Sequence, residues 1–194
     1  EVSPELLQAV VGEFADPGCR LVAPPVRYVC PSYNPFLRGY YALWRSMPYV
    51  RRDTTARGFY AIDAELRGRF GEFPKLTADD RFIRNLAKPE ERRIAKAGYT
   101  TVYQPASFGQ LLRVKTRWTL GNLQLAREHP ELAGNDQDGH SGGLGYILRR
   151  PWHWVNFPAF AFVYWYSQRK ARRLLAENKM SWLRADRAQA ADGK

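Results

Sequence analysis

The sequence predicts a mixed α/β domain followed by a helical C-terminal part. Helical and strand patterns alternate over residues 1–128, without internal repeats or low-complexity tracts. Of the 194 residues, 45% are hydrophobic and 14% aromatic, which suffices for one domain with a core. Beyond this part we expect a flexible Gly-rich loop over residues 129–150 and an aromatic, basic helical tail over residues 151–194.

The first helix is expected from Pro4 to about Phe14. Ser3 is a favoured N-cap, proline is favoured at the first helical position, and Glu5 places a negative charge in the first turn. The chain begins at Glu1, just before this cap, without a methionine or a signal-peptide pattern. We therefore expect it to be cut from a longer protein.

Two elements follow the first helix. Arg20–Ala23 has the pattern of a short buried strand, which Pro24 and Pro25 end because proline has no amide N–H. Asn34 then caps a second helix. Its large apolar residues recur at helical spacing and are interpreted as a core face rather than a ligand pocket: Phe36, Leu37, Tyr40, Tyr41 and Trp44.

Three further patterns complete the α/β part. Residues 58–62 and Thr100–Tyr103 are expected to be strands, and Asp63 is expected to cap a short helix that runs through Arg69. Ser107 and Gln110 have the spacing of a capping box, in which the two side chains bond each other's backbone N–H groups. A long helix is therefore expected from there to about residue 128.

Asp79 and Asp80 lie where a loop that contains Gly71 and Pro74 leads into an apolar helix. An aspartate at such a junction often only caps the helix. Alternatively the pair is catalytic, because adjacent carboxylates repel and one then has a raised pKa, which suits a general base that accepts a hydroxyl proton. The residues themselves leave both interpretations open.

The long helix carries a second set of candidate residues. Gln110, Arg113 and Arg117 recur at helical spacing and share one face. Two guanidinium groups one turn apart can bind a diphosphate in bidentate fashion. The alternative is a solvated basic face on which Gln110 serves only the capping box.

The formal net charge of +11 indicates an anionic partner. From residue 149 to residue 194 there are ten basic and three acidic residues, so +7 of this charge lies in the last quarter. Eight of the fifteen residues from Trp152 to Tyr166 are aromatic, and basic residues follow: Arg169, Lys170, Arg172 and Arg173. Since this segment is shorter than the roughly 20 residues of a membrane-crossing helix, an interfacial or re-entrant helix on an anionic membrane surface is expected.

Other kinds of site have weaker signals. Cys19 and Cys30 lack the spacing of metal ligands and are interpreted as reduced core thiols. Asp136-Gln137-Asp138 has the letters of a metal-binding DxD motif, but no strand precedes it, so a solvated loop is the simpler interpretation. No finger, RNP motif or helix-turn-helix accompanies the basic residues, so nucleic acid is not an expected partner.

Several of these motifs together resemble a known family. Residues 58–62, Gly71–Pro74, Asp79-Asp80 and Arg117-Trp118 have the order and spacing of the second half of family 2 glycosyltransferases, as in a membrane-associated member. The resemblance covers about residues 3–118, and Trp182–Asp186 loosely resembles a tail segment of some relatives. It implies a partial GT-A fold, the nucleotide-diphospho-sugar transferase fold, whose donor-binding strands and DxD motif would precede this chain.

The resemblance also implies roles for residues. Asp80 matches the catalytic base and Asp79 its acidic neighbour, while Arg117 and Trp118 match the end of a QxxRW motif that contacts diphosphate and acceptor. Val114 stands where that motif has glutamine, and Gln110 lies one turn earlier.

The activity implied is inverting transfer of a sugar from a nucleotide-sugar to a glycan or lipid-linked acceptor in polysaccharide synthesis, at the cytoplasmic face of the cell membrane. It would use a Mg or Mn ion whose protein ligand lies outside this chain. The alternative is a non-catalytic basic module that docks on a membrane.

Overall fold

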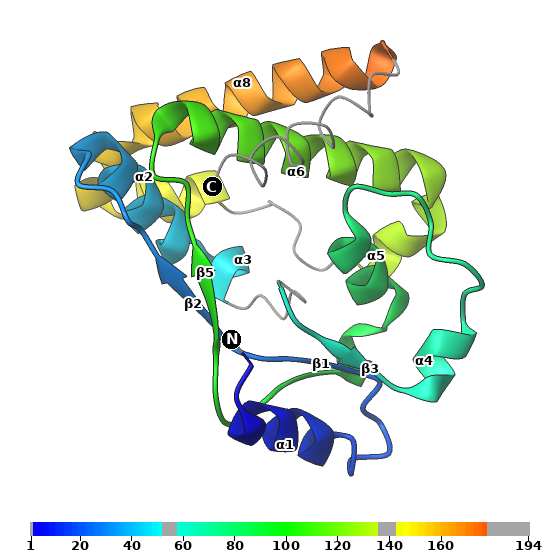
Figure 1. Cartoon of the computed structure of the whole chain (residues 1–194). Helices are drawn as coiled ribbons and strands as arrows, with labels where there is room; N and C mark the ends of the chain where they lie inside the picture. The colour runs from blue at the N-terminus through cyan, green and yellow to red at the C-terminus, as the bar shows by residue number, and fades with distance from the viewer. Residues whose placement is uncertain (1, 52–57, 136–142, 178–194) are drawn as a thin grey trace, which may run out of the picture.

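The computed structural model describes residues 2–51, 58–135 and 143–177, and it confirms the mixed α/β class. Helices α6 (Phe108–Glu128) and α8 (Phe157–Ala176) run side by side along one edge of the molecule, while α1 (Pro4–Glu13) lies at the opposite edge (Figure 1). Two small sheets lie between these edges. Asp136–Asp138 and Trp182–Asp186, which the sequence analysis singled out, lie outside the described residues.

The two sheets form one interrupted ladder. Strand β1 (Leu21–Ala23) pairs parallel with β4 (Arg92–Ile94) and antiparallel with β3 (Ala61–Ile62), and β2 (Val26–Val29) pairs parallel with β5 (Thr100–Tyr103). The amide of Thr100 donates to the carbonyl of Pro25 at 2.8 Å, at the start of the second ladder. The break falls at Pro24 and Pro25, which have no N–H to donate.

Two strand predictions need correction. The strand expected over residues 58–62 is only the two-residue β3, in which Ala61 and Ile62 pair with β1. Gly58 lies outside it with a φ of 82°, a left-handed conformation that does not continue a strand. Strands β2 and β4 were not predicted. Each has three or four residues, too few for a recognisable alternation of apolar and polar positions.

The predicted helix caps are confirmed. Ser3, Asn34 and Asp63 each accept a backbone N–H bond in the first turn of α1, α2 (Pro35–Ser46) and α4 (Ala64–Gly68). Ser107 and Gln110 form the capping box of α6, whose end at residue 128 also agrees with the prediction. The short helix α3 (Pro48–Arg51) follows α2 directly, and α5 (Asp79–Leu86) carries the aspartate pair.

The largest core cluster joins α2, α6 and α8. Leu37, Tyr40, Tyr41 and Trp44 of α2 are buried in it as expected, whereas Phe36 is 39% exposed. Helix α8 contributes Val163 to this cluster, and its buried residues continue at Ser167 and Ala171, four residues apart, so small side chains allow close packing on α6. Residues 157–176 are therefore packed on the domain rather than held apart as a tail.

The segment expected to be a flexible loop, residues 129–150, contains two helices where it is described. The 3₁₀ helix η2 (Pro130–Asn135) buries Leu132, and the side chain of Asn135 donates to the carbonyl of Asn85 at 2.9 Å. Arg92 donates to the carbonyl of Asn135 at 2.8 Å. Helix α7 (Gly143–Leu148) then leads to the 3₁₀ helix η3 (Pro151–Asn156). The burial of Leu132 and the hydrogen bonds of Asn135 favour a helical turn here in spite of the Gly-rich composition.

Candidate functional site

The loop that precedes α5 packs directly on α6. A Cβ atom at Gly121 would lie 3.0 Å from the Cβ of Ala78 and 3.1 Å from its backbone nitrogen. One turn further along α6, the side-chain oxygen of Gln124 accepts the N–H of Thr77, and its NH₂ group donates to the carbonyl of Lys75, both at 3.4 Å. Gly121 and Gln124 thus fix the start of α5 against α6.

Asp79 and Asp80 occupy the first turn of α5, and neither caps the helix. Ala78 is the N-cap and makes no side-chain capping bond, so the interpretation of an aspartate as the cap is wrong. Asp79 is exposed and Asp80 half-buried, and the Oδ1 atom of Asp80 accepts the N–H of Arg81 at 2.7 Å. Both carboxylates lie at the positive end of the helix dipole.

Tyr60, just before β3, lies near the aspartate pair. Burial raises the pKa of its phenol, and the negative charges of Asp79 and Asp80 raise that pKa further. The phenol therefore stays protonated at neutral pH and can donate a hydrogen bond. Sequence analysis placed Tyr60 in a strand but gave it no site role, because nothing local connects it to residues 79 and 80.

The loop before α5 meets α6 one helical turn from Arg117 and Trp118. Gly121, which contacts Ala78, lies one helical turn after these two residues, a rise of about 5–6 Å. Asp79 follows Ala78 directly. The chain just before the first motif thus contacts the helix that carries the second.

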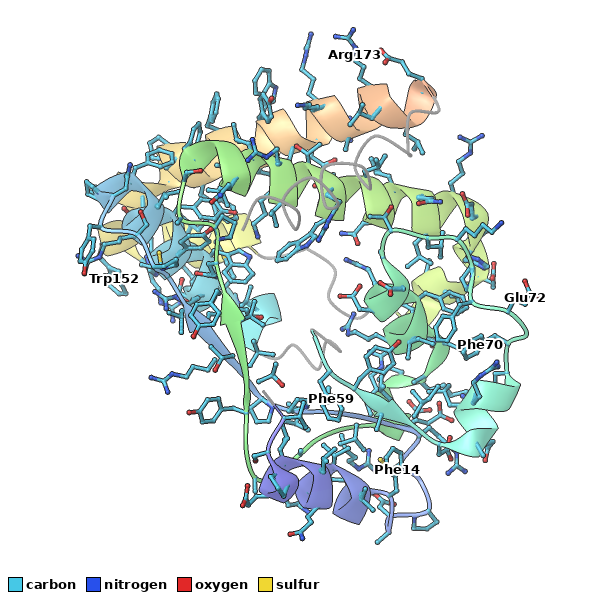
Figure 2. All side chains as sticks on the ribbon, viewed as in Figure 1. Phe14, Phe59, Phe70, Glu72, Trp152 and Arg173 are labelled. Carbon is cyan, nitrogen blue, oxygen red and sulfur yellow. The ribbon has the colours of Figure 1, made fainter. Side chains whose placement is uncertain are left out.

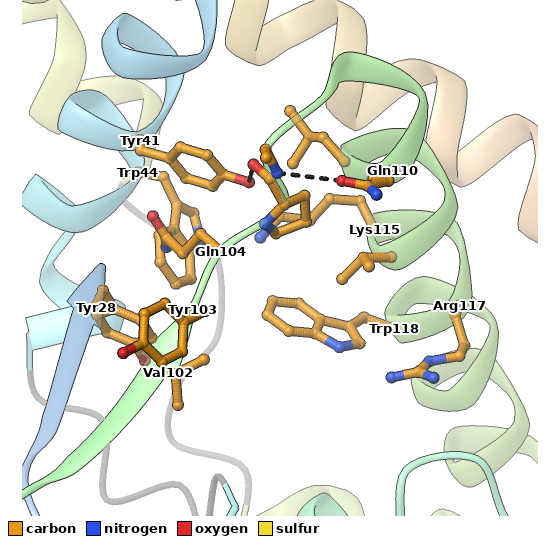
Figure 3. Close-up of a pocket in the computed structure, with 14 residues that line it drawn as sticks. Tyr28, Tyr41, Trp44, Val102, Tyr103, Gln104, Gln110, Lys115, Arg117 and Trp118 are labelled. Atoms are coloured by element: carbon orange, nitrogen blue, oxygen red, sulfur yellow. Dashed lines mark hydrogen bonds between the residues drawn. The ribbon is translucent and has the colours of Figure 1, made fainter. Parts of the chain in front are cut away.

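A cavity of about 590 Å³ lies between α2, the β2–β5 ladder and α6 (Figure 3). Tyr41 and Trp44 of α2 line the cavity on one side. Lys115, Arg117 and Trp118 of α6 line it on the other (Figure 3). Most of the remaining lining is aromatic or apolar: Tyr28, Val102, Tyr103, Pro105, Ala106, Leu111 and Val114, with Gln104 and Gln110 as the polar exceptions. No lining residue in the described part of the chain is acidic.

The cavity separates the residues that the sequence grouped on one helix face. Arg117, Trp118 and Gln110 line it, whereas Arg113 is exposed and outside the lining. The side-chain oxygen of Gln110 accepts the N–H groups of Ala106 and Ser107 at 3.2 and 3.3 Å, so the helix cap uses that oxygen. Arg117 is therefore the better placed of the two arginines to meet a ligand in the cavity.

Lys115 is a lining residue that sequence analysis missed. Its ammonium lies 4.2 Å from the ring centre of Trp44 and 4.3 Å from that of Trp118, within cation–π distance of both. The spacing of Lys115 and Trp118, three residues apart on a helix, could have signalled their contact. The contact with Trp44 could not be foreseen, because it depends on how α2 packs on α6.

Among the described residues, no three histidine, cysteine or acidic side chains converge to hold a metal ion. We therefore assign no metal ligand to them. Within the same residues, no helix has the length and apolar character needed to cross a membrane.

No family model, curated protein or solved structure matches the chain.

Proposed function

We propose that this chain is the acceptor-side part of a family 2 glycosyltransferase with a GT-A fold. The reaction would transfer a sugar from a nucleotide-sugar to an acceptor hydroxyl with inversion. One observation supports the proposal: Ala78, directly before the aspartate pair, packs on Gly121, which lies one turn of α6 from the Arg117-Trp118 pair on the cavity wall. In the proposed reaction this neighbourhood brings a proton acceptor and a cation to one substrate.

In this reaction Asp80 takes the proton of the acceptor hydroxyl as its oxygen bonds to the anomeric carbon of the donor. The bond from that carbon to the diphosphate oxygen breaks, and the diphosphate leaves with the electron pair. Asp80 is favoured over Asp79 because it is half-buried whereas Asp79 is exposed, and because it matches the base of the family that the chain resembles. The divalent ion expected for such enzymes would assist departure of the diphosphate.

Arg117 is proposed to bind the leaving diphosphate, with Arg113 as an outer cation. Replacing Arg117 by alanine should weaken binding of a nucleoside diphosphate to the complete protein by about 10- to 150-fold, because a charge-assisted hydrogen bond contributes roughly 1.5–3 kcal/mol. Isothermal titration calorimetry measures this. Arg127→Ala, which removes an exposed arginine from the last turn of the same helix, is the matched control.

The two variants separate a specific contact from a general effect of charge. Equal affinities for Arg117→Ala and the parent would contradict the diphosphate role. If Arg117→Ala and Arg127→Ala lose the same diphosphate affinity, the loss reflects only the lower net positive charge of the protein.

A peripheral position on an anionic membrane is proposed as well, at the cytoplasmic face. The specific observation is a set of exposed apolar side chains on η3 and α8, with relative exposures between 45% and 85%: Trp152, Trp154, Val155, Phe162, Tyr164 and Trp165. Trp152 lies near one end of α8 and Arg173 near the other (Figure 2). Exposed aromatic residues beside cations are typical of helices that lie in the headgroup region.

Replacing Arg169 and Arg172 by glutamine should reduce sedimentation with acidic liposomes by roughly 30-fold, since each basic residue near an anionic surface contributes about 1 kcal/mol. Lys88→Gln with Lys96→Gln removes the same charge from exposed positions remote from α8 and serves as the control. Binding that is the same for neutral and acidic lipid, or at low and high salt, would refute the electrostatic contribution.

A further inference from the structure

Four aromatic side chains form a continuous row across the N-terminal halves of three helices. The ring centre of Phe36 in α2 lies 5.1 Å from that of Phe108 in α6, and Phe108 lies 6.0 Å from Phe162 in α8. Trp165 continues the row at 6.3 Å from Phe162. This aromatic row joins α8 to the first turns of α2 and α6, and the three helices begin at the same end of the molecule (Figure 1).

The aromatic row is largely open to solvent. Phe36, Phe162 and Trp165 are 39%, 45% and 56% exposed, and Phe108 is half-buried. Tyr33, one residue before the cap of α2, is 94% exposed. Water-soluble proteins seldom expose a contiguous apolar surface of this kind unless it is an interaction site. The exposed apolar surface of η3 and α8 therefore continues onto α2 and α6.

The formal charges around the aromatic row are positive. Helices α2, η3 and α8 contain no aspartate or glutamate, and the acidic residue of α6 is Glu128, at its C-terminal end. Arg38 on α2, Arg113 on α6 and Arg172 on α8 are exposed. An apolar surface with this cationic border complements a bilayer with anionic headgroups. A second copy of the chain fits it less well, because like charges would then face each other.

The order of side chains along α8 shows which of its ends is apolar. Phe162, Trp165, Arg169 and Arg172 follow one another at intervals of three or four residues, so they share the face opposite the one that packs on α6. The aromatic residues of this face belong to the row, and the arginines follow toward the C-terminus. An arginine side chain can reach the headgroups while its stem covers apolar surface. A bilayer would thus receive the aromatic end of α8 more deeply than the basic end.

We propose that the aromatic row enters an anionic bilayer, so that α2 and α6 dock together with α8 while the arginines of α8 bind the headgroups. This inference rests on the membrane position proposed above. It adds a second contact, made by Tyr33 and Phe36, and it sets the orientation of the molecule. The first turns of α2 and α6 face the bilayer, and α1 lies at the opposite edge (Figure 1).

Sedimentation of the full chain with vesicles of phosphatidylcholine and phosphatidylserine in equal parts tests the second contact. Tyr33→Ser with Phe36→Ser should weaken binding about tenfold, because two exposed rings then no longer leave water on docking. The loss should be the same at low and high salt, since salt screens charges and not apolar burial. Leu7→Ser with Val11→Ser, which removes exposed apolar side chains from α1, is the matched control and should bind within about twofold of the parent.

A tryptophan placed in the row measures insertion without removing an aromatic side chain. In Phe36→Trp, lipids brominated in their acyl chains should quench the added fluorescence. In Leu7→Trp, which carries its tryptophan on α1, the added fluorescence should stay unchanged. This measurement decides the question even if the serine variant does not fold.

Binding of the serine variant equal to that of the parent would overturn the inference, and so would a loss confined to low salt or an unquenched tryptophan at position 36. If the parent is a dimer in analytical ultracentrifugation and the serine variant a monomer, the row is a protein contact, which also overturns it. A parent that binds no vesicles would refute the proposed membrane position as well. None of these measurements involves sugar transfer or diphosphate binding, so failure here and failure of the proposed reaction can be told apart.

Discussion

Replacing Asp80 by asparagine is expected to lower sugar transfer by the complete protein 10²- to 10⁴-fold while nucleoside diphosphate affinity stays within about twofold. The amide keeps the size and shape of the side chain but does not accept the acceptor proton. Steady-state kinetics with donor titration, together with a melting curve, measures the effect. A loss of this size corresponds to roughly 3–5 kcal/mol of activation free energy.

The structure sharpens this prediction because Asp80 does not cap α5. The structural cost of Asp80→Asn then includes no lost cap, and its first-turn charge contributes about 0.3–1 kcal/mol of stability. Glu5→Gln removes an equivalent exposed first-turn charge from α1 and should leave transfer unchanged. If Asp80→Asn melts at a lower temperature but turns over within a few-fold of the parent, Asp80 is not the base, and Asp79→Asn becomes the decisive variant.

The sequence predicted those features of the fold that depend on neighbouring residues. Ser3, Asn34, Asp63 and Ser107 were recognised as caps because each bonds an amide within its own first helical turn. The ends of α6 followed from its capping box and its composition. The prediction of a loop over residues 129–135 was wrong because the helix there does not depend on neighbouring residues alone. Leu132 packs against residues far away in the chain.

The candidate site was predictable only as separate parts. The sequence identified the Asp79-Asp80 pair and the Arg117-Trp118 pair. How the two are arranged in space depends on Gly121, which has no side chain and so lets the backbone of Thr77 and Ala78 approach α6. Lys115 was overlooked because it is unremarkable until α2 brings Trp44 against it. Trp44 was interpreted as core and is both core and cavity wall, so these two roles do not exclude each other.

Gly121 is the residue on which the arrangement of the site most depends. A Cβ there already meets Ala78 at 3.0 and 3.1 Å and the carbonyl carbon of Thr77 at 3.3 Å, and two of these three atoms belong to backbone. Valine would add two more methyl groups against the same loop. Relief then requires the start of α5, with Asp79 and Asp80, to move away from α6. Overpacking of this kind costs about 1–3 kcal/mol of stability.

Gly121→Val should therefore reduce transfer by about a hundredfold or more, because a displacement near 1 Å of a catalytic group has effects of that order. Binding of a nucleoside diphosphate should change less than about threefold, because Arg117 stays on an intact helix whose valine is a better helix former than glycine. Gly12→Val provides the matched control, since a Cβ at Gly12 in α1 meets nothing within 4 Å. Kinetics, calorimetry and melting curves on the two variants separate a local shift from unfolding. Turnover of Gly121→Val within a few-fold of the parent would mean that the reaction does not require the aspartate pair to be held on α6, and the proposed pairing of Asp80 with Arg117 would then be wrong.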